Sequence, residues 1–131
     1  CVAYFTIEHR GAIPEDFREG VGDWVMGCDV CQEVCPWNRF ALAGPVFSPV
    51  LPESAPLEEL AALTPAAFRE RYGKTPVERA RRRGLARNAL LAMGNSRDPK
   101  FRPILESCAA GEDELLAQQA KWSLARMAQK L

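Results

Sequence analysis

From residue 57 onward, apolar residues recur at the three- and four-residue spacing of an α-helix. Several stretches open with a capping residue followed by a proline, as at Thr64-Pro65, Thr75-Pro76 and Asp98-Pro99. Glycine or polar residues separate them. The pattern predicts a short helical turn with leucines at 57, 60 and 63, then helices over residues 65–72, from 76 to about 93, from 98 to about 108 and over 112–130.

Each of the three longer predicted helices carries one apolar stripe. The stripes are Leu85, Ala89, Ala92 and Met93; Phe101, Ile104, Leu105 and Cys108; and Leu116, Ala120, Leu124, Met127 and Leu131. Residues 90–93 and 124–127 look alike at an offset of about 34, which is typical of stacked α-hairpin repeats of the HEAT kind. A plain helical bundle would give the same stripes, so both arrangements remain open.

Prolines interrupt the pattern between residues 41 and 56. Pro45, Pro49, Pro52 and Pro56 fix φ and remove backbone donors, so neither a helix nor a sheet propagates there. We therefore expect three regions: a cysteine-rich segment over 1–40, a Pro-rich linker over 41–56 and a helical domain over 57–131.

The size and composition of the chain narrow its class. A chain of 131 residues can bury one modest core or two small ones. No apolar run approaches the ~20 residues that cross a bilayer, and no secretory signal opens the sequence, so we expect a cytoplasmic protein without a membrane partner. Because the first residue is Cys1 rather than Met, we expect a piece of a longer protein.

The formal net charge is zero, yet the charge is segregated along the chain. Residues 1–73 carry five basic and eleven acidic residues, a net charge of −6. Residues 74–102 carry nine basic and two acidic residues, a net charge of +7. A basic block of this kind indicates a polyanionic partner.

Three cysteines lie within eight residues, at Cys28, Cys31 and Cys35, and Pro36 follows at once. The C-x2-C-x3-C-P spacing is the second half of a bacterial ferredoxin run, whose thiolates hold cubane clusters and whose last cysteine ligates the other cluster. Cys1 is the natural donor of the missing thiolate. Two clusters need eight thiolates, and the chain has five cysteines, so the remaining ligands must come from elsewhere.

Two other uses of the cysteines remain open. A zinc site could use the same four side chains, although zinc frameworks usually pair two short C-x2-C hooks. Disulfides are less favoured in a chain without a secretory signal. The fifth cysteine, Cys108, falls on an apolar stripe and is interpreted as a core residue.

Two stretches resemble the C-terminal third of epoxyqueuosine reductases: residues 1–8, CVAYFTIE, and residues 27–38, GCDVCQEVCPWN. Thr75-Pro76, Arg87-Asn88 and Gly94-Asn95 are similar to the C-terminal repeats of that family. The resemblance implies a mainly α fold, in which half of a bacterial ferredoxin-like two-[4Fe–4S] domain precedes a HEAT-like repeat domain. It also implies reduction of epoxyqueuosine to queuosine at the wobble position of tRNA, with cobalamin as a further cofactor.

The same resemblance implies roles for individual residues. Cys1, Cys28 and Cys31 would hold the second cluster with a thiolate from upstream, and Cys35 would cross to the first cluster. The backbone at Asp29 and Val30, and more weakly at Ala3, would touch cobalamin; packing within the cluster loop is the alternative for these three. No catalytic residue is expected in this piece, which would be inactive alone.

The resemblance makes tRNA the polyanion. Arg79, Arg82, Arg83 and Arg87 are spaced to share one broad helix face, and a guanidinium fork suits phosphate. An ordinary solvated helix face is the alternative. Arg10, one of the few bases in the acidic half, is expected to reach the anticodon arm.

Two other functions stay open on the residues alone. One is a ferredoxin-like electron-transfer module with a helical protein-binding domain. The other is a zinc-stapled RNA-binding adaptor. For the reductase we expect an external electron donor and a monomer.

Overall fold

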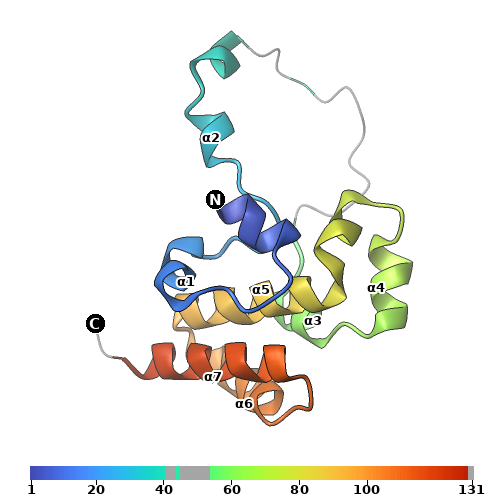
Figure 1. Ribbon diagram of the computed structural model, residues 1–131, viewed down its shortest axis with the longest axis vertical. Coiled ribbons are helices and arrows are strands. Elements are labelled where there is room, and N and C mark those ends of the chain that lie inside the picture. The colour runs from blue at the N-terminus through green and yellow to red at the C-terminus, as the bar shows by residue number, and fades with distance from the viewer. Residues whose placement is uncertain (41–43, 45–53, 130–131) are drawn as a thin grey trace.

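The computed structural model describes residues 1–40, 44 and 54–129 (Figure 1). This part of the chain is mainly helical and contains no strand. Its elements are η1 (Tyr4–Glu8), α1 (Glu15–Val21), α2 (Val30–Glu33), η2 (Pro36–Phe40), α3 (Leu57–Ala62), α4 (Pro65–Tyr72), η3 (Pro76–Ala80), α5 (Arg81–Ser96), η4 (Pro99–Phe101), α6 (Arg102–Ala109) and α7 (Glu114–Ala128). Within these residues no helix is both long and apolar enough to cross a bilayer.

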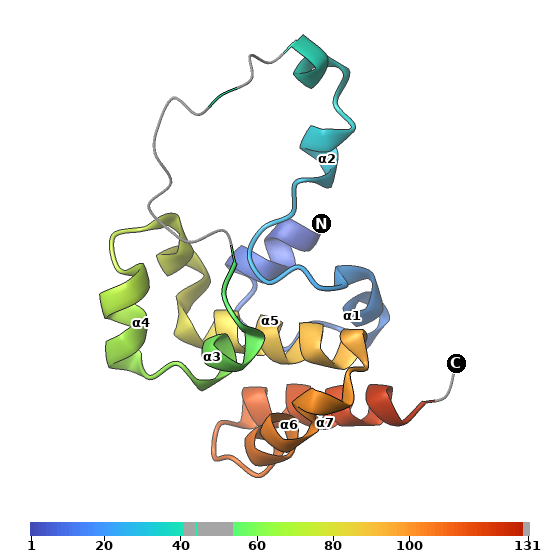
Figure 2. The same ribbon diagram turned by 180° about the vertical axis from the view of Figure 1, so that it is seen from behind.

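Helix α5 lies at the centre of the molecule. Every residue from Leu85 to Gly94 is buried, so the helix is covered on all sides. Helices α6 and α7 lie along one side of it, and η1 and α1 lie along the opposite side, as both views show (Figures 1 and 2). The cysteine-rich segment and the helical region therefore share one central helix.

Two apolar clusters surround α5. The larger cluster joins α5 to α3, α4, α6 and α7, and the stripe residues Leu105, Leu116 and Ala120 lie inside it. The smaller cluster packs Ile13 and Val21 from the N-terminal segment against Leu91. Burying side chains of this size stabilises the fold by about 1.5–3 kcal/mol each.

Helix α4 matches the sequence prediction at both ends, and α7 begins two residues after its predicted start. Helix α4 covers the predicted residues 65–72, and the Thr64 hydroxyl accepts a hydrogen bond of 3.2 Å from the amide of Ala67. Helix α7 begins at Glu114 because the Asp113 carboxylate accepts hydrogen bonds from the amides of Leu115 and Leu116, at 3.1 and 3.3 Å. Most of the predicted linker, together with the predicted positions 130 and 131, falls outside the described residues.

The predicted helix from residue 76 to 93 is wrong at both ends. Arg81 has a φ of 59°, which separates η3 from α5. The helix then continues through Gly94 and stops at Arg97, whose φ of 55° is left-handed. Gly94 does not end the helix: a Cβ there would lie 2.6 Å from the Cβ of Ser123, so the glycine permits close contact between α5 and α7.

Candidate metal centre and basic surface

The four candidate cysteine ligands lie in residues 1–40, the N-terminal segment. Cys1 directly precedes the helical turn that includes η1, and Cys28 follows Gly27. Cys31 lies in α2, and Cys35 lies between α2 and η2, the two turns that extend away from the rest of the fold (Figure 1). All are free thiols and are exposed or half-buried, so all four remain available to a metal.

Local backbone geometry shapes the loop of Cys28, Cys31 and Cys35. Gly27 has a φ of 77°, a conformation that side chains disfavour, and it turns the chain into Cys28. Asn38 donates a hydrogen bond of 2.6 Å to the carbonyl of Gln32, which closes the loop around Cys35. Asn38 belongs to the CPWN string, but sequence analysis gave it no role.

The chemistry of this donor set fits an iron–sulfur cluster, because thiolates are the preferred ligands of iron in such clusters. The structure does not gather the donors: in the part of the chain it describes, no three His, Cys, Asp or Glu side chains could hold one ion. The assignment of Cys1, Cys28, Cys31 and Cys35 as ligands therefore remains a prediction from spacing.

The three predicted cobalamin contacts lie near these cysteines along the chain. Asp29 is exposed at the start of α2, and its carboxylate accepts a hydrogen bond of 3.0 Å from the side chain of Gln32. Val30 is 47% exposed, which is unusual for a valine and leaves its surface open to a partner. Ala3 is half-buried, and its carbonyl faces the Thr6 hydroxyl at 3.4 Å.

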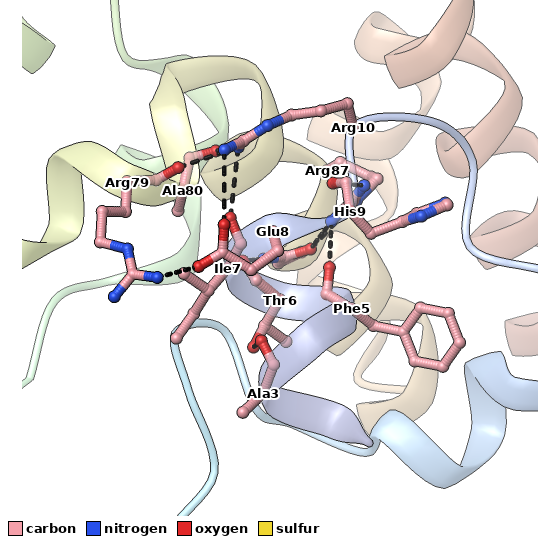
Figure 3. A network of polar contacts seen from close by, with 11 residues as sticks. Ala3, Phe5, Thr6, Ile7, Glu8, His9, Arg10, Arg79, Ala80 and Arg87 are labelled. Carbon is pink, nitrogen blue, oxygen red and sulfur yellow. Dashed lines mark hydrogen bonds and ion pairs between the residues drawn. The ribbon is translucent and has the colours of Figure 1, made fainter.

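The expectation that four arginines share one exposed face is wrong for Arg87. Its side chain is 0% exposed, and all five of its N–H groups are used. It donates to the carbonyls of Phe5 (2.6 Å) and His9 (2.9 Å), as Figure 3 shows. It also donates to the carbonyl of Gly11 (2.6 Å) and twice to the Asn88 side chain. A guanidinium held in this way cannot reach an RNA phosphate.

Burial lowers the pKa of Arg87 to about 10, with a smaller contribution from the charge of Arg10. The group therefore stays charged at neutral pH, although no carboxylate among the described residues pairs with it. Its charge is stabilised by carbonyl dipoles, including that of His9, the C-cap of η1, where a helix favours cations.

The other predicted RNA-binding arginines are partly or fully exposed, and each has a partner. Arg10 donates to the carbonyls of Ile7 (3.2 Å) and Arg79 (2.8 Å), and Arg79 pairs with Glu8 (Figure 3). Arg82 makes one long contact of 3.4 Å to the carbonyl of Leu63. Arg83 pairs with Asp113 at 2.8 Å. Exposed pairs of this kind are weak, typically ~0–1 kcal/mol, so a phosphate could displace the carboxylate.

Three basic residues that sequence analysis did not single out are exposed near the same elements. Arg69 lies in α4, Lys74 precedes η3 and Arg81 follows it. None of these side chains forms an ion pair among residues 1–40 and 54–129, although the backbone amide of Lys74 donates to the Glu78 carboxylate at 3.2 Å. Lys74 and Arg81 also have positive φ values of 64° and 59°, a strained state that only tertiary context could reveal.

Known proteins resemble this chain over nearly its whole length. Residues 1–38 match a family model described as a 4Fe-4S double cluster binding domain. The chain is 37% identical to the epoxyqueuosine reductase of Xanthomonas campestris pv. campestris over 130 residues, covering 96% of this chain and 37% of the relative. It is 37% identical to that of Escherichia coli (strain K12) over 134 residues, covering 99% of this chain and 35% of the relative. The chain thus spans about a third of the length of these relatives.

Solved structures agree with the sequence relatives. The epoxyqueuosine reductase of Streptococcus thermophilus is similar over 100% of this chain and 35% of that chain, with a TM-score of 0.85 and 27% identity. A crystal structure of epoxyqueuosine reductase with a tRNA-TYR epoxyqueuosine-modified tRNA stem loop is similar over 98% of this chain and 35% of that chain, with a TM-score of 0.82 and 25% identity.

Proposed function

The chain is related to the epoxyqueuosine reductases over nearly its whole length, and we propose that it is the C-terminal third of such an enzyme, an oxidoreductase that reduces epoxyqueuosine to queuosine in tRNA. The observation that carries the proposal is the run Cys28, Cys31, Cys35 and Pro36, inside the segment that matches a double-cluster domain. The activity belongs to the longer protein, and this third contributes cluster ligands and an RNA surface.

In this proposal Cys1, Cys28 and Cys31 bind one [4Fe–4S] cluster with a thiolate from upstream, and Cys35 binds the other. Bound clusters supply low-potential electrons, and cobalamin supplies the cobalt that acts on the epoxide. The chain holds and orients these groups. Exposed Val30 and the neighbouring Asp29 offer the surface for cobalamin, and Ala3, two residues after Cys1, is the weaker third contact.

The tRNA-binding surface in this proposal comprises Arg10, Arg79, Arg82 and Arg83, without the buried Arg87. Lys74, Arg81 and Arg69 extend it, because their charges have no carboxylate partner among the described residues. The strained backbone at Lys74 and Arg81 supports this extension, since such strain concentrates at functional positions.

A charge test addresses this surface. In the full-length protein, replacing Lys74 and Arg81 by alanine should weaken tRNA binding and make its salt dependence shallower by about 0.7–0.9 per lost phosphate contact. Lys100 and Arg102, which are also exposed but pair locally with Asp98 and Glu106, give the matched control. An equal effect of both double substitutions would contradict the assignment of the surface.

Further parts of the proposal concern architecture and setting. The pairwise packing of α3 on α5 and of α6 on α7 supports HEAT-like hairpins over 57–131, preceded by a linker over 41–56 and a cluster segment over 1–40. We also propose that the longer protein is a monomer supplied by an external electron donor. We place it in the cytoplasm, because tRNA modification requires access to tRNA.

The decisive test removes one thiolate from the full-length protein. Cys28→Ser should lose iron, visible cluster absorption and conversion of epoxyqueuosine to queuosine, measured by mass spectrometry of tRNA nucleosides. Cys108→Ser is the matched control, because Cys108 packs beside the helical core, where burial raises the pKa of its thiol. A wild-type protein that binds zinc in place of iron, or a Cys28→Ser protein with unchanged iron content, would refute the function.

A further inference from the structure

The Asn88 side chain connects two parts of the N-terminal segment that are distant in sequence, at Thr6 and Val25. It is 0% exposed. Its Nδ2 donates hydrogen bonds of 2.8 Å to the carbonyls of Thr6 and Val25, and its Oδ1 accepts both bonds from Arg87. The amide is fully satisfied, so its orientation is fixed: a flipped amide would lose all four bonds.

The Thr6 side chain continues this connection toward two cysteines. Thr6 is 1% exposed. Its hydroxyl donates to the carbonyl of Val2 at 2.9 Å and accepts from the amide of Gly27 at 3.0 Å. Val2 adjoins Cys1, and Gly27 adjoins Cys28. One hydroxyl therefore bridges the residues next to two candidate ligands, and Figure 3 shows Thr6 on the turn that also carries Ala3 and Phe5.

Both side chains are buried, and both bond to backbone groups of the N-terminal segment. Apart from the Asn88–Arg87 contact, neither depends on another side chain. Backbone bonds from two separate segments set the distance between those segments. A cluster requires its thiolates at fixed separations, so a bridge at this position bears on the metal.

We propose that Thr6 and Asn88 are positioning residues that fix the Cys1 thiolate relative to the Cys28 thiolate. They thereby determine how slowly the cluster bound there releases iron and what spectrum its reduced form gives. This inference rests on the proposed function, in which these two cysteines ligate the same cluster. Helix α5 then contributes to the metal centre without providing a ligand. Arg87 supports the bridge by holding the Asn88 amide from behind.

The test uses the full-length, cluster-loaded protein and three substitutions at or beside the bridge. Thr6→Val keeps the shape and removes the hydroxyl, whereas Thr6→Ser retains it. Asn88→Asp keeps the size of the side chain and can still accept from Arg87, but it loses both donations to backbone. Ser123→Ala is the control, because Ser123 is equally buried and donates to the carbonyl of Leu90 at 2.8 Å, on the opposite side of α5.

Two properties of the cluster are measured: the rate of iron release to a chelator and the electron paramagnetic resonance spectrum of the reduced protein. Thr6→Val and Asn88→Asp should release iron roughly tenfold faster than wild type, with altered spectra. Thr6→Ser and Ser123→Ala should match wild type in both, even where Ser123→Ala lowers the melting temperature as much as Thr6→Val does.

The outcomes separate this inference from the function on which it rests. A wild-type protein without iron refutes the proposed function and this inference together. An iron-loaded wild type whose Thr6→Val and Asn88→Asp variants keep its release rate and spectrum refutes the bridge alone. If Thr6→Val does not fold, Asn88→Asp decides by the same two measurements, and an Asn88→Asp protein indistinguishable from wild type again refutes the bridge.

Discussion

Replacing Arg87 by methionine tests whether the buried guanidinium holds the N-terminal segment on α5. Methionine keeps a long apolar stem and removes all five N–H donors, which serve the carbonyls of Phe5, His9 and Gly11 and the Asn88 amide oxygen. Each buried acceptor left without a donor costs about 1–3 kcal/mol. The acceptors are therefore the source of the expected loss.

The magnitude follows from how buried each acceptor is. The Asn88 oxygen is fully buried, whereas water can rehydrate part of the carbonyl contacts. Methionine also removes the unfavourable burial of a charge, the effect that lowers the pKa of Arg87. The unsatisfied Asn88 oxygen and the incompletely rehydrated carbonyls cost about 1–3 kcal/mol each, and the relief of the buried charge offsets part of this sum, so we expect Arg87→Met to lose about 3 kcal/mol. Small domains are stable by only about 5–15 kcal/mol.

The assay is urea denaturation of the chain under reducing conditions, followed by circular dichroism. A loss of about 3 kcal/mol should lower the midpoint by roughly 1–3 M urea. Arg83→Met is the matched control: the same substitution on the same helix removes an exposed pair with Asp113, worth ~0–1 kcal/mol. If the two variants unfold within about 0.5 kcal/mol of each other, the proposed importance of the buried network is refuted.

Two further predictions concern α5 and α7. Gly94→Ala should destabilise the fold by about 1–3 kcal/mol, because its Cβ would overlap Ser123. Gly84→Ala is the control: with open space around it, it should be neutral or stabilising by up to ~1 kcal/mol. Equal urea midpoints for the two variants would contradict the close contact between α5 and α7. The hydrogen bond from Arg83, which outweighs partial burial, lowers the pKa of Asp113. The resulting stabilisation is present above about pH 4, the ordinary pKa, and is lost as pH falls through the lower folded value. Asp113→Asn should therefore lose up to ~1 kcal/mol at pH 7 and progressively less as pH falls through the lowered folded pKa of Asp113, measured by urea denaturation. A loss independent of pH would contradict the ionic contribution.

Local signals predicted much of the fold. Thr64-Pro65 and Gly73 mark the ends of α4 because capping acts within a few residues of a helix terminus. The apolar stripe ending at Cys108 predicted the buried side of α6, because its residues recur at the period of a helix. The break at Arg81 was not predictable, since no sequence rule places an arginine in a left-handed conformation.

The fate of Arg87 depends on partners far away in sequence, so the local pattern misled. Within a run of bases it was interpreted as an exposed residue that binds tRNA phosphate, yet its carbonyl acceptors lie in residues 5–11. One available signal was the uninterrupted sequence LARNALLAMG over 85–94, which is nearly apolar all round and typical of a central helix. Thr6 and Asn88 lie in stretches that resemble the family, but the residues themselves gave no sign of their role, because a threonine and an asparagine are ordinary at most positions.

The shared central helix limits how this region can be exchanged between proteins. Severing the chain between residues 40 and 54 would leave one piece with orphaned carbonyls at Phe5 and Thr6, and the other with an unmatched Arg87-Asn88 pair. Water could solvate these groups once the pieces separate, but the buried hydrogen bonds and apolar contacts that joined the pieces would be lost. Recombination that transplants the cysteine-bearing segment should therefore succeed only when the recipient already supplies an equivalent arginine–asparagine pair, so the two regions are constrained to be inherited together.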